Sequence, residues 1–120
     1  MRKFAILCFS AILAVACETL PEDSRDALVG TWTCKETSQT YTITVSKAEY
    51  EEDKMYFDNL YNVHQKADVT ISGSTLSIPE QTLSNWVIKG SGTVNSSKTT
   101  ITLNYTADTD SIKATLTKNN

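Results

Sequence analysis

The segment Thr100-Ile101-Thr102-Leu103-Asn104-Tyr105 alternates apolar side chains with threonine or asparagine at every step. A period of two places one kind of side chain on each face of a β-strand, whereas an amphipathic helix repeats every three or four positions. Threonine is β-branched, favours extended backbone and carries a hydroxyl that water solvates. This segment therefore predicts a strand with one apolar face and one face rich in hydroxyl groups.

The same alternation recurs along the chain and predicts an antiparallel sheet with one wet side. The further strands are expected near residues 32–34, 41–45, 55–60 (with mixed phase), 69–71, 76–78, 86–92 and 112–116. Ser72-Gly73-Ser74 predicts a tight hairpin, and Pro79-Glu80 is expected to end a strand because proline cannot donate to a ladder. Residues 94–98 and 108–111 are expected polar connectors, and residues 47–53 the longest loop.

Eight short strands with no room for crossover helices predict an all-β fold, a small antiparallel eight-stranded meander barrel. A tight sandwich is the alternative arrangement. An eight-stranded interior is just wide enough to be filled by side chains, so we expect a largely filled barrel.

The composition narrows the class of function. The chain has 120 residues, enough for one domain, and its formal net charge is −3. An acidic balance argues against a nucleic-acid partner, which needs clustered lysine and arginine. A single histidine leaves little material for a metal site or a catalytic triad, and we expect no metal and no cofactor.

The N-terminus carries the pattern of an export signal. Met1-Arg2-Lys3 is basic, and residues 4–16 are apolar apart from Ser10 but too few to span a membrane. Residues 1–16 are therefore predicted to be a cleaved signal peptide. The end of this segment together with the next residue, Leu13-Ala14-Val15-Ala16-Cys17, resembles the lipobox of bacterial lipoproteins, in which the cysteine is acylated and holds the protein to a membrane. It departs from that pattern at Ala14, where leucine is usual. The alternative is ordinary cleavage after Ala16, with Cys17 left as a free thiol.

Cleavage of the signal peptide would remove Arg2 and Lys3. The mature chain would then have nine basic side chains against 14 acidic ones, a net charge of −5. Residues 17–28 are expected to form the lipidated N-terminus and a solvated acidic tether, and residues 29–120 the barrel domain. Acidic residues just after Cys17 (Glu18, Glu22 and Asp23) resemble the surface-export signals of Bacteroidetes lipoproteins. The expected location is the outer membrane, at the cell surface or else on the periplasmic face.

Gly30-Thr31-Trp32, at the start of the first expected strand, resembles the signature of the lipocalin and calycin barrels. The resemblance implies that Trp32 packs across the closed end of the barrel beside a basic residue of the last strand. Lys113 and Lys118 both fit that role. About 90 residues of domain are fewer than a ligand-enclosing lipocalin has, which favours a filled interior.

A second resemblance rests on four blocks of sequence, the first of which includes the Gly30-Thr31-Trp32 motif, and it is to small Bacteroidetes lipoproteins with lipocalin-like or calycin-like domains. The blocks are residues 29–32, 57–62, 76–81 and 90–93. The resemblance implies fold and location, and it supplies no catalytic residues.

Cysteine and histidine offer one enzymatic alternative. Cys34 is the only cysteine expected in the folded domain, and it is read mainly as a small buried hydrophobe. A nucleophilic Cys34 would need a base, for which His64 is the only candidate, and His64 is expected in an exposed turn. The acidic group of Glu49, Glu51, Glu52, Asp53 and Asp58 lacks the spacing of an EF-hand and is expected to be solvated.

The aromatic residues supply the candidate contact site. Tyr56, Tyr61 and Trp86 are predicted to contact a ligand or partner. Tyr41 and Tyr105 are in phase with aliphatic neighbours and are expected in the core, and the same phase leaves a core position as the alternative for Trp86. The sequence therefore predicts a membrane-anchored, non-enzymatic lipocalin-like binding module that takes a small apolar ligand, a glycan or a protein. The alternative is an inhibitor or accessory protein that binds its partner through surface loops such as residues 47–53. A Cys-dependent enzyme is the third class.

Overall fold

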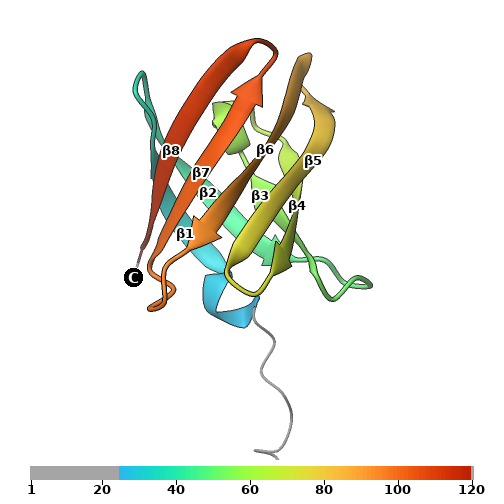
Figure 1. Cartoon of the computed structure of the whole chain (residues 1–120), viewed down its shortest axis with the longest axis vertical. Helices are drawn as coiled ribbons and strands as arrows, with labels where there is room; N and C mark the ends of the chain where they lie inside the picture. Colours follow the sequence, from blue (N-terminus) through green and yellow to red (C-terminus); the bar gives the residue numbers. More distant parts are fainter. Residues whose placement is uncertain (1–24, 120) are drawn as a thin grey trace, which may run out of the picture.

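The computed structural model describes residues 25–119 and shows a closed antiparallel barrel in which each strand pairs with the next and the last pairs with the first (Figure 1). The elements are η3 (Asp26–Leu28), β1 (Gly30–Lys35), β2 (Thr40–Lys47), β3 (Lys54–Asp58), η4 (Leu60–Asn62), β4 (Lys66–Ser72), β5 (Thr75–Leu83), β6 (Trp86–Val94), β7 (Thr100–Ala107) and β8 (Asp110–Lys118). The predicted all-β, eight-stranded meander is confirmed, and the sandwich alternative is wrong. The expected signal peptide, Cys17 and the first part of the tether lie outside the described residues.

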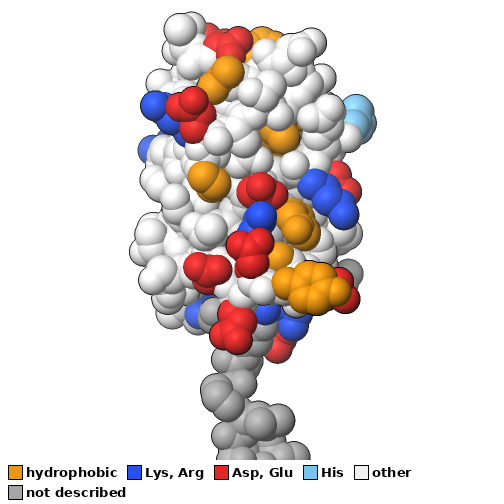
Figure 2. Space-filling model, turned by 90° about the vertical axis from the view of Figure 1, so that its right-hand side faces the viewer, with side chains coloured by type: hydrophobic (Ala, Val, Ile, Leu, Met, Phe, Trp, Pro, Cys, Tyr) orange, Lys and Arg blue, Asp and Glu red, His pale blue; other side chains and the backbone are white. Residues whose placement is uncertain are grey.

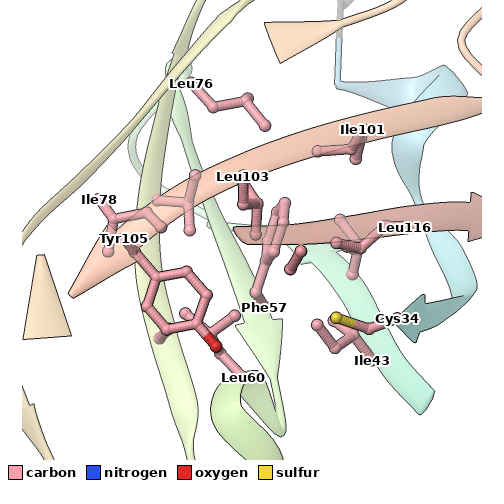
Figure 3. Packing of buried hydrophobic residues seen from close by; sticks show 14 of the residues in the cluster. Cys34, Ile43, Phe57, Leu60, Leu76, Ile78, Ile101, Leu103, Tyr105 and Leu116 are labelled. Carbon is pink, nitrogen blue, oxygen red and sulfur yellow. The ribbon is translucent and has the colours of Figure 1, made fainter. Parts of the chain in front are cut away.

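Alternation along each strand sends every second side chain into the barrel. In β2, Tyr41, Ile43 and Val45 are buried and the threonines between them are exposed. The inward side chains of all eight strands meet in the middle, where Phe57, Leu103 and Leu116 approach one another (Figure 3). These residues are all fully buried, as a filled eight-stranded interior requires.

The barrel is sealed at the end where the described chain enters it. Leu28 and Trp32 are fully buried there, and the indole nitrogen of Trp32 donates to the carbonyl of Leu28 over 2.8 Å. The ammonium of Lys118 lies 5.9 Å from the centre of the Trp32 ring and donates to the carbonyl of Ala27. Of the two lysines left open by the sequence, Lys118 therefore lies beside Trp32.

The folded domain begins before the expected boundary at Val29. The Arg25 side chain is only 6 % exposed, and its guanidinium donates to the carbonyls of Ala48, Glu51 and Lys54. These bonds fasten the chain to the loop between β2 and β3. Residues 25–28, expected in the solvated tether, are thus part of the barrel's sealed end, because a guanidinium can satisfy several loop carbonyls at once.

Pro79 does not end its strand, contrary to the sequence prediction. β5 continues to Leu83, and its register with β6 shifts between Ile78 and Gln81. A bulge takes the residue without an N–H group out of the ladder. The Gln81 side chain replaces ladder bonds to β4, since it donates to the carbonyl of Asp68 and accepts from the amide of Asp68.

Turn residues close the remaining hairpins. Gly73 has a φ of 62° in the tight hairpin between β4 and β5, as predicted. Ser84 and Asn85, with φ values of 50° and 74°, connect β5 to β6 in two residues, which suits a primed turn. The last connector is shorter than predicted, because Asp110 and Ser111 already belong to β8.

Gly90 and Gly92 allow β7 to approach β6 closely. A Cβ at Gly90 would stand 2.4 Å from both the Asn104 carbonyl oxygen and the Tyr105 Cβ, and one at Gly92 would stand 2.6 Å from the Thr102 carbonyl oxygen. Glycine is therefore required at both positions for β7 to come this close to β6.

We expect Gly90→Ala to lower the free energy of unfolding by about 1–3 kcal/mol or more, because the added methyl meets backbone and a Cβ that cannot yield cheaply. Urea denaturation of the two proteins measures the difference. Gly73→Asn is the matched control, since nothing lies within 4 Å of a Cβ there and asparagine tolerates positive φ. Equal stability losses in the two variants would contradict the requirement for glycine at position 90.

Candidate functional site

The end of the barrel opposite η3 is formed by four connections between strands. A hydrogen-bonded carboxylate and a cluster of aromatic side chains lie at this end. Residues 36–39, 59–65, 84–85 and 108–109 lie there, at the top of Figure 1. We refer to this end as the mouth. The sequence places large aromatic residues on or next to three of these connections.

At the mouth, the carboxylate of Glu36 accepts hydrogen bonds from three side chains. The Tyr41 hydroxyl donates to Glu36 Oε2 over 2.6 Å, and the Tyr105 hydroxyl donates to the same oxygen. Gln39 Nε2 donates to the other oxygen over 2.9 Å. Glu36 is half-buried, so these three donors replace water that the carboxylate has lost.

Burial raises the pKa values of Tyr41 and Tyr105 well above the usual range, and the neighbouring carboxylate of Glu36 adds to the effect. Both phenols therefore stay protonated and act as permanent donors to Glu36. They fix the Glu36 turn to β2 and β7, two strands that are not neighbours in the sheet.

Tyr61 covers the centre of the mouth. Its ring meets Trp86 edge-on with centroids 5.2 Å apart, and meets Tyr105 edge-on at 6.1 Å. Its backbone amide donates to the Tyr41 hydroxyl over 2.8 Å. Tyr61 and Trp86 are both half-buried, which leaves part of an aromatic surface open to solvent.

The segment that carries Tyr61 has an unusual backbone. Asn59, Tyr61, Asn62 and His64 all have positive φ, and Tyr61 has a φ of 61°. A bulky residue in the left-handed region costs on the order of 1–3 kcal/mol, so the surroundings must hold it there. Asn59 does this by donating from its amide to Thr42 O and accepting from the His64 amide.

The structure brings together two of the three predicted contact residues. Tyr61 and Trp86 touch, whereas Tyr56 lies on the outer face of β3 with the ammonium groups of Lys54 and Lys66 5.7 and 5.4 Å from its ring centre. Sequence reasoning missed Glu36, because one of its partners, Tyr105, is 69 positions away in the sequence. The only available signal was its position at the end of an alternating segment.

Two hollows open on the surface beside the mouth. The larger, about 600 Å³, is lined by Ile78, Lys89, Gly90, Asn104, Tyr105, Thr106, Ser111, Ile112 and Lys113. Five of these side chains point outward, and the inward Ile78 and Tyr105 are only 2 % and 3 % exposed. The hollow therefore lies on the outside of β6–β8 and does not enter the barrel. The smaller, about 190 Å³, separates the Glu36 turn from the start of β8 and is bordered by Tyr61.

Figure 2 shows the face of the barrel at 90° to the view of Figure 1, where no large group of hydrophobic side chains is seen. There, hydrophobic side chains occur singly or in small groups among charges of both signs (Figure 2). A surface of this kind is ordinary for a water-exposed protein face. This view therefore adds no continuous apolar patch to the features at the mouth and over β6–β8.

Cys34 is fully buried between Ile43 and Leu116 (Figure 3). Burial raises the pKa of its thiol to about 12, although a hydrogen bond with Tyr41 works in the opposite direction. A thiol with this pKa stays protonated at neutral pH and is a poor nucleophile. His64 is exposed, as the sequence predicted.

Among residues 25–119, no group of three or more His, Cys, Asp and Glu side chains is arranged to hold a metal ion. Glu49, Glu51, Glu52 and Asp53 are exposed in the loop between β2 and β3. Within the same range, no helix has the length and apolarity needed to cross a membrane.

No protein-family model and no curated protein matches the chain. A solved structure described as a redesigned β barrel, b11L5F_LGL, is similar with a TM-score of 0.53 and 17 % identity. The similarity covers 82 % of this chain and 96 % of that one. At this identity, the likeness supports the barrel fold alone.

We expect Tyr61→Ala to expose Trp86. The chain has two tryptophans, and Trp32 is fully buried, so acrylamide quenching of the folded protein reports mainly on Trp86. The quenching constant should rise in Tyr61→Ala and stay unchanged in the control Tyr56→Ala, whose ring lies elsewhere. An unchanged constant in Tyr61→Ala would show that Tyr61 does not cover Trp86.

We expect the free energy of unfolding to fall as the pH rises above 9. The unfolded thiol of Cys34 loses its proton near pH 9.0 and the folded thiol only near 12, so the folded state retains a proton that the unfolded state has lost. One such group changes the free energy by about 1.4 kcal/mol per pH unit at most. The fall between pH 9 and 10, measured by urea denaturation, should be shallower in Cys34→Ala. Equal slopes would contradict the raised thiol pKa.

Proposed function

We propose that this chain is a lipid-anchored, non-enzymatic interaction module of the outer membrane with a lipocalin-like barrel. The lipobox-like residues 13–17 support the anchor at Cys17. Gly30, Trp32 and Lys118 at the sealed end support the lipocalin-like assignment, since they combine the Gly-x-Trp motif with a basic residue of the last strand.

The observation that carries the proposal is the position of the aromatic mouth. η3, where the described chain enters the barrel, lies at one end, and the connections that carry Tyr61 and Trp86 lie at the other (Figure 1). A barrel tethered through its N-terminus therefore presents Tyr61 and Trp86 away from the membrane. Half-buried aromatic residues held by a strained segment are typical of contact sites.

The filled interior decides the manner of binding. A carrier that encloses its ligand needs an empty lumen, whereas here the inward side chains are buried against one another. Recognition at the outer surface, of a protein, a glycan or a small apolar group, fits this barrel better than enclosure.

The alternative of an inhibitor that inserts the loop of residues 47–53 has less support. That loop lies at the sealed end, and Arg25 fastens the carbonyls of Ala48 and Glu51. In a tethered barrel it would face the membrane. An inhibitor or accessory role would instead use the mouth connections.

Crosslinking in intact cells tests the proposal. A photoreactive amino acid placed at Tyr61 or Trp86 should give adducts, whereas the same group at Tyr56 should give few, because Tyr56 lies away from the mouth. Mass spectrometry of the mature protein should find acyl groups on Cys17.

Each arm of the experiment contradicts a separate part of the proposal. Equal adducts from Tyr56 and Tyr61 would exclude the mouth as the contact surface. An N-terminal peptide with an unmodified Cys17 would exclude the lipid anchor.

A further inference from the structure

The larger hollow has a floor without outward side chains. Ile78, Gly90, Tyr105 and Ile112 face one another across β5, β6, β7 and β8 in a single row of strand partners. The side chains of Ile78, Tyr105 and Ile112 point into the barrel and Gly90 has none, so only backbone reaches the outer surface along this row. The close approach of β7 to β6 at Gly90 lies in the same row.

The rows on either side form the rim. Lys89, Thr106 and Ser111 are partners in one row, and Asn104 and Lys113 in the other, and all five point outward. Lys89 and Lys113 are two strands apart and lie in different rows, so they occupy diagonal corners of the hollow. Long lysine side chains contribute apolar methylene groups to its walls and keep their ammonium groups in water.

The charges at the rim favour an anion. Lys113 has no ion pair within the described residues. Lys89 is 3.9 Å from Glu80, but both side chains are more than 60 % exposed, and a surface pair of this kind contributes little. Two lysine ammonium groups therefore stand beside this hollow, and the carboxylates nearest to Lys113, those of Glu36 and Asp110, line the smaller hollow on its other side.

The lining favours an aliphatic body over a sugar. The surface of the hollow is mainly apolar, and Tyr105, the only aromatic residue that lines it, turns its ring into the barrel. Sugars usually stack on an exposed aromatic face, which is lacking here. A volume of about 600 Å³ is within the range of small-molecule sites.

We propose that the hollow over β6–β8 binds a small aliphatic carboxylate, with its chain on the floor row and its acidic group at Lys89 or Lys113. The site is on the outside of the barrel and is distinct from the aromatic mouth. It does not depend on the lipid anchor, so it stands or fails independently of the function proposed above.

Titration with octanoate tests this site. The protein is the chain with Cys17→Ser, so that no acyl group at that position competes, and binding is followed by calorimetry. Octanoate should bind, octanamide should bind more weakly, and octylamine more weakly still. At least one of Lys89→Glu and Lys113→Glu should weaken octanoate binding about fivefold or more, the effect of roughly 1 kcal/mol of Coulomb energy at a wet surface.

Two further variants keep the test decisive. Asn104→Trp should abolish binding by filling the hollow from an exposed strand position, which a β-favouring residue tolerates. Lys66→Glu, a lysine on the other side of the barrel beside Tyr56, should leave binding unchanged. Absence of octanoate binding, equal binding of octanamide, or an equal effect of Lys66→Glu would overturn the proposal.

Discussion

The pairing of β8 with β1 is the constraint on which the rest of the molecule depends. This pairing has only four residue pairs, which run from Trp32 with Lys118 to Lys35 with Thr115. Trp32, Leu28 and Lys118 seal the barrel on one side of this seam. On the other side β1 has ended, and among the described residues the first half of β8 pairs with β7 alone. The hollows, the Glu36 turn and Tyr61 all gather near that unpaired half.

A barrel of this size leaves the interior to side chains and the chemistry to its surface. Phe57, Met55 and Leu103 are fully buried in the centre, and the thiol of Cys34, buried in the same core, is held protonated. The carboxylate of Glu36 accepts hydrogen bonds from two buried phenols. The apolar rows are therefore inside the barrel, and the two proposed contact sites, the aromatic mouth and the β6–β8 hollow, are outside it.

The alternation of apolar residues with threonine was enough to predict the strands. A period of two can be recognised from neighbouring residues alone, and each threonine indicates which face of its strand is exposed to water. Pro79 misled the prediction, since a bulge and the Gln81 side chain preserve a strand that the local rule would end. The choice between Lys113 and Lys118 was beyond a local rule, because it depends on the register of β8 against β1. The Glu36 cluster and the hollow could not be predicted for the same reason, because the cluster joins a turn to two separate strands and the hollow joins four strands.

The proposed ligand contacts all lie on the outside of a filled barrel. Amide and methyl NMR spectra of the chain with Cys17→Ser, recorded during titration with octanoate, distinguish this arrangement from binding inside. Perturbations should concentrate at Lys89, Asn104, Thr106 and Lys113, while the methyl signals of Leu103, Leu116 and Ile43 should not shift. Perturbations that centre on those interior methyl groups, with the outer rim unchanged, would contradict it.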